Sequence, residues 1–469
     1  MTASSGSTLR AVLLASSFAF IVVQLDVTIV NVALPAVGKE LGADVGALQW
    51  VVDAYTLGFA VFLLTAGLMG DRFGPRRIFL AGFALFAAAS VACALAPSVL
   101  ALDVARVAQG IGAALLVPSS LSILNSAYAH DKVGLAKAIG WWTAAGGVSI
   151  AAGPVVGALL LSIGGWRSIF WVNVPICLAG FVLACKAVPR VHAASAARSF
   201  DLPGQLLAMV ALTALVGAVI EAPARGWSSA IVLAALGCAV LAASAFVVVE
   251  RRSRTPMLPL RLFGNAGFSA AVMFGVLVNF SYYGVIFILS IYLQRVRGFS
   301  ATETGLAFLP LTGTFIFSNI ASGWLTSRAG LRMPMVLGAL LGAAGYALLG
   351  SLGSARDASF LQMLPGLALI PAGMGLAVPA MTTSILGSVQ AHQAGVASAV
   401  LNTARQVGGA MGVAVFGAMV AAGSPDQAER GLQLAMAVSS ALLLAAGALA
   451  YRYIARSSPA PASATSLCR

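Results

Sequence analysis

Charged residues inside apolar stretches are the residues with which this chain could do chemistry. Asp26 lies within the run FIVVQLDVTIVNVALPAV, from Phe20 to Val37, which is long enough to cross a bilayer. Placing a charged aspartate at the centre of a membrane helix costs about 2.5 to 3.5 kcal/mol. Arg106 lies in a second such stretch. A carboxylate and a guanidinium at this depth point to a site that binds and releases a proton.

The composition identifies the class of protein. Of 469 residues, 60% are hydrophobic and only 9% are charged, which is typical of a chain that crosses a membrane many times. The 27 basic residues exceed the 14 acidic ones, but they lie in short gaps between apolar segments. A membrane-topology signal explains them better than a nucleic-acid partner does. The five cysteines predict neither a disulfide framework nor a metal site.

Fourteen apolar segments are long enough to be membrane helices, which predicts an all-α integral membrane fold. They cover approximately residues 11–35, 48–70, 77–97, 99–127, 134–161, 166–187, 204–222, 229–250, 266–293, 304–327, 333–353, 359–386, 395–421 and 431–453. Polar gaps divide them into groups of six, two and six. The predicted domains are a six-helix bundle at 1–190, a linker with two extra helices at 191–262 and a second six-helix bundle at 263–469.

The Lys and Arg residues indicate the orientation. With the N-terminus placed inside the cell, most of those in the gaps fall on the cytoplasmic side, as the positive-inside rule requires. We therefore expect a multi-pass protein of the cytoplasmic membrane with both termini in the cytoplasm.

An internal repeat supports two related halves. The loop after the second segment reads GDRFGPRR, and the loop after the tenth reads TSRAGLRM. The residues that correspond are Arg72 with Arg328, Gly74 with Gly330 and Arg76 with Arg332. Repeated halves around a site near the membrane midplane are typical of transporters.

Several motifs, in the right order, resemble those of one transporter family. GLMGDRFGPRRIFL, from Gly67, resembles the loop signature of the major facilitator superfamily, and LDVTIVNVALP, from Leu25, resembles the first-helix motif of its fourteen-helix drug:proton antiporters. RVAQGIGAA, from Arg106, and GGVSIAAGPVVGALL, from Gly146, are similar to the fourth-helix and fifth-helix motifs. WRSIFWVNVPI resembles the start of the sixth helix. The resemblance implies export of lipophilic drugs or antibiotics in exchange for protons.

The loop between the second and third segments is a candidate gate formed by Gly67, Asp71, Arg72, Gly74 and Arg76. Glycine permits a tight turn, and the arginines hold the loop at the anionic cytoplasmic face. One interpretation is a plain topology determinant. The other is that Asp71 docks on the N-terminus of the thirteenth segment, whose partial positive charge attracts it. The resemblance implies the same contact, as a latch that closes the inner gate.

The fifth segment carries Gly153 and Gly157, which form a GxxxG face, and Pro154, which bends a helix. Simple helix packing explains this pattern as well as a functional role does. The resemblance implies the functional role, a seal between the two halves that hinders passive leak.

Depth in the membrane makes Arg106 the partner expected for Asp26. Helix rise places the two residues roughly 12 and 13 Å below the outer surface. A purely structural ion pair is the alternative to a proton-coupling site. Asp53 and Glu221 are further proton-coupling candidates, although each could instead lie at the membrane interface.

Other polar residues are candidates for a substrate cavity: Asn31, Asn279, Tyr282, Tyr283 and Arg405. Asn31 belongs to a polar stripe that points almost opposite to Asp26 on the first helix and also contains Gln24, Thr28 and Pro35. Only one face of the first helix can line the cavity. We expect Asp26 to lie on the side of the cavity or of Arg106, and the stripe to pack against a neighbouring helix.

Two other functions, nucleotide-driven transport and enzymatic catalysis, require motifs that the sequence does not contain. No GxxxxGK[ST] phosphate loop occurs, so uphill transport would use an ion gradient. The three histidines lie in or beside loops and form no metal or nucleophile cluster, which argues against an enzyme. We expect a monomeric proton antiporter without a cofactor, whose partners are a small lipophilic substrate, protons and membrane lipid. The alternative is a proton-coupled symporter or a carrier for an endogenous metabolite.

Overall fold

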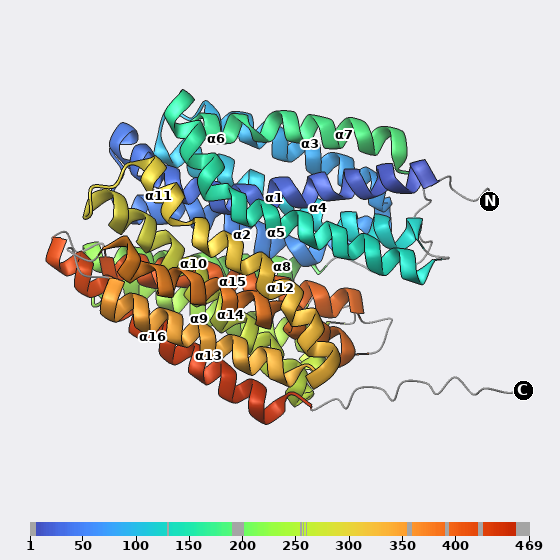
Figure 1. Ribbon diagram of the computed structural model, residues 1–469. Coiled ribbons are helices and arrows are strands. Elements are labelled where there is room, and N and C mark those ends of the chain that lie inside the picture. Colours follow the sequence, from blue (N-terminus) through green and yellow to red (C-terminus); the bar gives the residue numbers. More distant parts are fainter. Residues whose placement is uncertain are drawn as a thin grey trace, which may run out of the picture.

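The computed structural model is a bundle of helices (Figure 1). It describes residues 6–128, 131–189, 201–253, 256, 258, 260–353, 359–389, 394–420 and 425–455, and no strand occurs within these ranges. The first half contains α1 (Gly6–Leu41), α2 (Val45–Phe73), α3 (Pro75–Ala94), α4 (Val99–Ala127), α5 (Lys132–Gly164), the short α6 (Ser168–Trp171) and α7 (Asn173–Ala187). The predicted all-α membrane fold is confirmed in its class.

The remaining helices follow the predicted order. The middle of the chain contains α8 (Leu202–Arg225), α9 (Ala230–Arg252) and the 3-10 turn η1 (Leu260–Gly264). The second half contains α10 (Ala266–Arg295), α11 (Ala301–Ala307), α12 (Leu309–Ala329), α13 (Arg332–Leu348), the π-helical turn η2 (Leu349–Gly353), α14 (Phe360–Gly387), α15 (Ala394–Val420) and α16 (Pro425–Tyr453).

Twelve helical spans in the described part of the chain are long and apolar enough to cross a membrane. A thirteenth candidate is α5, which is bent by 45° between Ile150 and Ala152. Pro154 explains the bend, because a proline ring clashes with the carbonyl four residues earlier, here that of Ile150. The helix α15 is not among the candidates, since a polar run that includes Asn402, Arg405 and Gln406 interrupts it. The count of fourteen crossings therefore stays a prediction.

The two halves pack alike. In the first half α1 packs on α5, α2 on α4, and α3 on α4 and α7. The counterparts α10 and α15, α12 and α14, and α13 with α14 and α16 pack in the same way in the second half. Between the halves, α2 packs on α15, and α5 packs on α11 and α12. The internal repeat is thus present in the packing as well as in the loops.

The two repeated loops have the same local structure. Gly74 and Gly330 end α2 and α12 with φ of +90° and +76°, a region that favours glycine. Nη2 of Arg76 donates to the carbonyl of Cys185 near the end of α7, at 2.9 Å. Nε of Arg332 donates to the carbonyl of Ile454 just after α16, at 2.7 Å. In each half, the repeated arginine fastens the loop to the end of that half's last helix.

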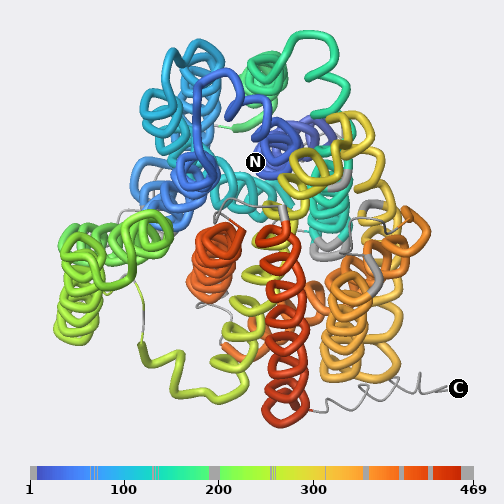
Figure 2. The backbone as a smooth tube through the Cα atoms, turned by 90° about the vertical axis from the view of Figure 1, so that its left-hand side faces the viewer, coloured from blue at the N-terminus to red at the C-terminus, as the bar shows by residue number. Residues whose placement is uncertain are grey.

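The two extra helices lie together at the side of the bundle (Figure 2). Of the pair, α8 contacts both α2 of the first half and α15 of the second. Nε2 of Gln205 donates to the carbonyl of Val61 on α2 at 3.0 Å, and the Thr65 hydroxyl bonds the same side chain. The extra pair is therefore fastened to the boundary between the halves.

Candidate functional site

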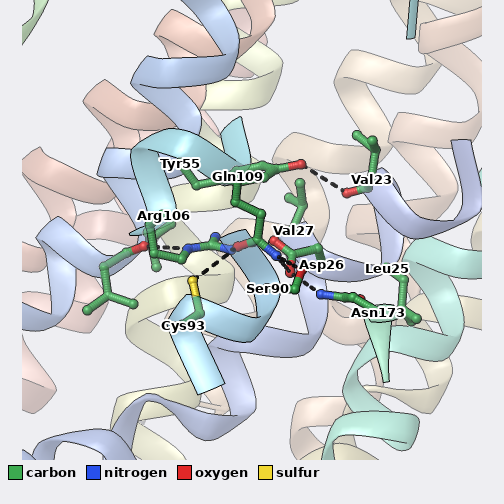
Figure 3. A network of polar contacts seen from close by, with 12 residues as sticks. Val23, Leu25, Asp26, Val27, Tyr55, Ser90, Cys93, Arg106, Gln109 and Asn173 are labelled. Carbon is green, nitrogen blue, oxygen red and sulfur yellow. Dashed lines mark hydrogen bonds and ion pairs between the residues drawn. The ribbon is translucent and has the colours of Figure 1, made fainter. Parts of the chain in front are cut away.

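Asp26 lies at the centre of a buried polar network (Figure 3). Its Oδ2 accepts from the Arg106 guanidinium in an ion pair. Its Oδ1 accepts from Nε2 of Gln109 at 2.9 Å and from Nδ2 of Asn173 at 2.8 Å. All four side chains are buried, and they come from α1, α4 and α7. The contact between Asp26 and Arg106 that the depth argument predicts is present.

Arg106 is held from a second side by α2. Its Nε donates to the carbonyl of Val51 at 3.0 Å, and its Cζ lies 4.3 Å from the centre of the Tyr55 ring, a cation–π contact. Close approach of α2 and α4 requires Gly110, because a Cβ there would lie 2.2 Å from the Tyr55 carbonyl oxygen. The guanidinium is therefore fixed by three helices of one half.

Two members of this network have no role in the sequence-based prediction. Gln109 lies three residues after Arg106, on the same face of α4, and its Nε2 also donates to the Ser90 hydroxyl at 2.9 Å. Asn173 lies in the motif WRSIFWVNVPI at the start of α7. Both residues lie inside motifs that were identified from the sequence, RVAQGIGAA and WRSIFWVNVPI. Their spacing alone did not show that they meet Asp26.

A small cavity lies beside the network, between the two halves. It is lined by Val27, Asn31, Val52, Tyr55, Thr56, Arg106, Tyr283, Gln406, Gly409 and Val413. Its open space holds about one water molecule, whereas sites for drug-sized ligands measure about 300 to 1,000 Å³. The Arg106 side chain thus has one face toward Asp26 and another toward this cavity, which is nearly closed in this conformation.

A second small cavity lies between α1, α5, α10 and α12. It is lined by Thr28, Ile150, Pro154, Tyr282, Ile286, Phe308, Leu311 and Phe315. The predicted cavity residues are therefore divided: Asn31 and Tyr283 line the first cavity and Tyr282 lines the second. Asn279 and Arg405 line neither of these two.

The polar stripe of α1 faces two neighbours. Thr28 packs against α5, as expected, since a Cβ at Gly153 would lie 2.0 Å from its hydroxyl oxygen. Asn31 instead lines the first cavity, and its carbonyl accepts from the Ser290 hydroxyl of α10 at 2.7 Å. The expectation that the whole stripe faces one helix is wrong for Asn31. A residue three positions along lies about 60° around the helix, and α1 borders both α5 and α10.

Asp53 is fully buried, and neither of its carboxylate oxygens has a hydrogen-bond partner among the described residues. One turn earlier on the same face of α2, Nε2 of Gln49 donates to the carbonyls of Val413 and Ala414 on α15, at 3.0 and 2.8 Å. Asp53 therefore lies within the contact between the two halves, with no exposure to the surface. An unpaired buried carboxyl is costly and points to a functional role.

Arg405 and Asn279 lie together on α15 and α10. Nε of Arg405 is 3.5 Å from Oδ1 of Asn279, whose own Nδ2 donates to the carbonyl of Gly275 at 2.7 Å. Glu221, by contrast, accepts from Nε of Arg225 at 2.6 Å near the end of α8, where both side chains are more than one-third exposed. The structure thus gives Glu221 a surface ion pair.

The candidate gate is described in part. Arg72 is exposed, Arg76 bonds the end of α7, and a Cβ at Gly67 would meet nothing within 4 Å. The side chain of Asp71 lies outside the described residues, so its contact with the N-terminus of α15 stays a prediction.

The fifth-helix motif has two faces. Gly153 and Gly157 lie against Thr28 and Ile29 of α1, within the same half. The contact with the other half is made by the adjacent face, where a Cβ at Gly305 of α11 would lie 2.8 Å from the Pro154 carbonyl oxygen. The GxxxG face therefore packs within the first half, while Pro154 contacts the second half. The seal between the halves stays a prediction.

Gly153→Leu should destabilise the protein, because a Cβ there would lie 2.8 Å from Cβ of Thr28 and 3.2 Å from the backbone nitrogen of Ile29. These atoms cannot move away unless α1 itself shifts. Overpacking of this kind costs about 1 to 3 kcal/mol. Thermal unfolding of the purified variant measures the loss. Gly140→Leu is the matched control on the same helix, since a Cβ there meets nothing within 4 Å. Equal melting temperatures for the two variants would show that the close approach is not needed.

Comparisons with known proteins agree on one family. Residues 16–413 match the model of the Major Facilitator Superfamily. The chain is 39% identical to the "Multidrug resistance protein Stp" of Mycobacterium tuberculosis, over 87% of this chain and 75% of that protein. It is 40% identical to the "Tetracenomycin C resistance and export protein" of Streptomyces glaucescens, over 87% of this chain and 75% of that protein. It is 36% identical to the "Methylenomycin A resistance protein" of Bacillus subtilis, over 89% of each.

Solved structures share the fold. A bacterial homologue of the human lysosomal transporter Spinster, in an inward-facing conformation, aligns with a TM-score of 0.67 at 19% identity, over 97% of this chain and all of that one. The xylose transporter XylE from E. coli aligns with a TM-score of 0.67 at 15% identity, over 96% of this chain and 99% of that one. The chain belongs to the Major Facilitator Superfamily and is a membrane transporter rather than an enzyme.

Proposed function

We propose that this protein is a proton-coupled antiporter that exports lipophilic drugs or antibiotics across the cytoplasmic membrane by alternating access. The observation that carries the proposal is the buried carboxylate of Asp26, which is paired with an arginine that also lines the cavity between the halves. The proposal includes fourteen crossings arranged as six, two and six, both termini in the cytoplasm, and a monomer whose partners are protons, lipid and the drug.

The geometry suggests how a proton would change the conformation. Asp26 accepts from three donors, which belong to Arg106, Gln109 and Asn173. A proton on the carboxylate turns one acceptor into a donor and removes its charge, so at least one of these contacts breaks. The contact with Arg106 depends most on that charge. Its release would leave the guanidinium free to turn toward the cavity.

This proton step fits a cycle of alternating access. A proton from the outer side would free Arg106 and permit the inward-open state, in which the drug binds. Loss of the proton to the cytoplasm would restore the ion pair and reset the carrier. The relatives named for resistance to or export of tetracenomycin C and methylenomycin A support drug efflux as the direction of transport.

Exchange measured in proteoliposomes tests the function. Under an imposed pH gradient, addition of a transported drug should release protons from the vesicles, and a proton gradient should drive the drug the opposite way. A drug panel in a pump-deficient host expressing the chain identifies the compounds to use. Drug and protons moving in the same direction would establish the symporter instead.

Asp53 is proposed as a second proton-carrying group. Burying an ionised carboxylate without a partner costs several kcal/mol, so we propose that Asp53 holds a proton in this conformation and releases it when α2 and α15 separate. Asp53→Asn should keep the stability of the fold, because no hydrogen bond or ion pair is lost. It should lower the number of protons exchanged per drug by about one. The ratio follows from the pH gradient that just balances a known drug gradient, and an unchanged ratio would exclude Asp53 from coupling.

A further inference from the structure

Arg405 is a cation inside the bundle that has no carboxylate beside it. It lies about 16 Å along α15 from the first residue of that helix, near the middle of the predicted thirteenth membrane helix. The ion pairs among the described side chains all involve other residues. Its contact with Asn279 is at the outer limit for a hydrogen bond and brings no charge. An unpaired charge at this depth needs a partner or access to water.

The described part of the second half supplies no resident counter-charge at this depth. Residues 263–469 contain only four acidic residues, Glu303, Asp357, Asp426 and Glu429. Glu303 lies in the first turn of α11, Asp426 and Glu429 lie near the start of α16, and Asp357 lies outside the described residues. The helices α10, α12, α13, α14 and α15 contain no Asp or Glu.

The two carboxylates of the first half that the structure describes as fully buried supply no free negative charge to Arg405 in this conformation, because Asp53 is proposed above to hold a proton and Asp26 is already paired. Asp26 holds Arg106, and neither residue is more than 1% exposed. The ion pair is neutral as a whole. Arg405 therefore leaves the described surroundings of the cavity with a net positive charge, which repels a cationic ligand and attracts an anionic one.

The segment around this arginine is partly exposed and lies next to residues that line the first cavity. All residues from Asn402 to Val407 are partly exposed, although α15 is surrounded by α2, α8, α10, α14 and α16. Gln406, the next residue, and Tyr283, one turn beyond Asn279 on α10, both line the first cavity. The amide and the phenol hydroxyl thus offer hydrogen-bond donors in the first cavity, and the guanidinium, next to the amide in the sequence, offers further donors.

We propose that Arg405 binds an anionic group of the transported molecule, so that the cargo is a lipophilic acid rather than a lipophilic cation. The anionic group is a carboxylate or an ionised enol or phenol, which a guanidinium binds through two parallel hydrogen bonds. This inference rests on the proposed function, because it names the cargo of the same transporter. It assigns to the second half the binding of cargo, and leaves proton binding to the first half.

Three probes with one ring system test the inference: anthracene-9-carboxylate, anthracene-9-carboxamide and 9-(aminomethyl)anthracene, which are anionic, neutral and cationic at neutral pH. Binding to the purified protein, without any gradient, is followed by probe fluorescence. The carboxylate should bind tightest. Arg405→Gln should weaken the carboxylate about tenfold or more and leave the other two nearly unchanged, because one charged contact is lost. Arg405→Lys should keep part of the preference.

The control is Arg328→Gln, which removes a charge at the exposed end of α12, where the guanidinium stacks on Trp324 at 4.1 Å. It should leave binding of all three probes as in the wild type. Absent or weaker binding of the carboxylate, or an equal loss of all three probes in Arg405→Gln, would overturn the inference. The binding assay does not depend on proton transport. If drug and protons fail to exchange in proteoliposomes, the proposed antiport is wrong, but the preference of Arg405 for an anionic ligand is still supported by the binding data.

Discussion

Asp26→Asn should abolish drug efflux and drug-triggered proton release together, while the protein still folds and inserts. The amide keeps the size of the side chain but cannot alternate between a charged and a neutral form. Its carbonyl oxygen can still accept from Gln109 or Asn173. Arg106 is left without its anion, but it still donates to the Val51 carbonyl and borders the cavity. Drug-triggered pH change in proteoliposomes, at matched protein content, measures the loss.

Two further variants make this result specific. Asp26→Glu keeps an ionisable group and should retain part of both activities. Asp44→Asn makes the same chemical change at the N-cap of α2, where Asp44 Oδ1 accepts from the backbone N–H of Ala47 at 2.8 Å, and asparagine caps a helix equally well. It should transport as the wild type does. Exchange of drug for protons at a comparable rate in Asp26→Asn would move the coupling site elsewhere, with Asp53 next.

Helix periodicity and membrane depth were sufficient to predict the contact between Asp26 and Arg106. Each residue is expensive alone in hydrocarbon, and two helices of known direction place both at one level. The same reasoning could not predict Gln109 and Asn173 as the other partners of Asp26. Amides are tolerated in many environments inside a membrane protein, so their position in the sequence carries little information. Only the rotation of α4 and α7 about their axes brings them to the carboxylate.

The sequence did not predict which neighbouring helix each helix face contacts. Gly153 and Gly157 predict close packing, and close packing is present, but the partner is α1 and not a helix of the other half. Asp53 could be either interfacial or buried by its depth in α2, and it is buried. Both outcomes depend on how the two halves meet, which is a long-range property that no local pattern contains.

Polar residues inside a helix also make hydropathy an unreliable guide to the number of membrane crossings. The cluster around Arg405 makes α15 too polar to be a membrane span by composition, although its neighbours enclose it. A helix surrounded by protein does not need an apolar surface all around. One of the residues that weaken the membrane signal of α15, Gln406, also lines the first cavity.

Arg106→Gln should cause the largest loss of stability of the variants considered. Without the guanidinium, Asp26 is a fully buried charge with no cation. Breaking a buried ion pair by removing one partner costs about 3 to 5 kcal/mol. The cation–π contact with Tyr55 and the bond to Val51 are lost as well. The midpoint of thermal unfolding, measured on purified protein in detergent, should fall well below that of the wild type.

The double variant Asp26→Asn with Arg106→Gln separates charge from packing. It leaves no uncompensated charge, so it should be more stable than Arg106→Gln alone even though it lacks one more native side chain. Arg167→Gln is the matched control, because Arg167 pairs with Glu40 where the side chains are 35% and 52% exposed, and such pairs contribute about 0 to 1 kcal/mol. If the double variant is as unstable as Arg106→Gln, the arginine stabilises the bundle through packing, and the cost of an unpaired Asp26 is small. If the double variant unfolds at a higher temperature than Arg106→Gln, the cost of leaving a buried charge unpaired is what makes the ion pair important. Protonation of Asp26 would remove that charge, so a single proton could switch the contact.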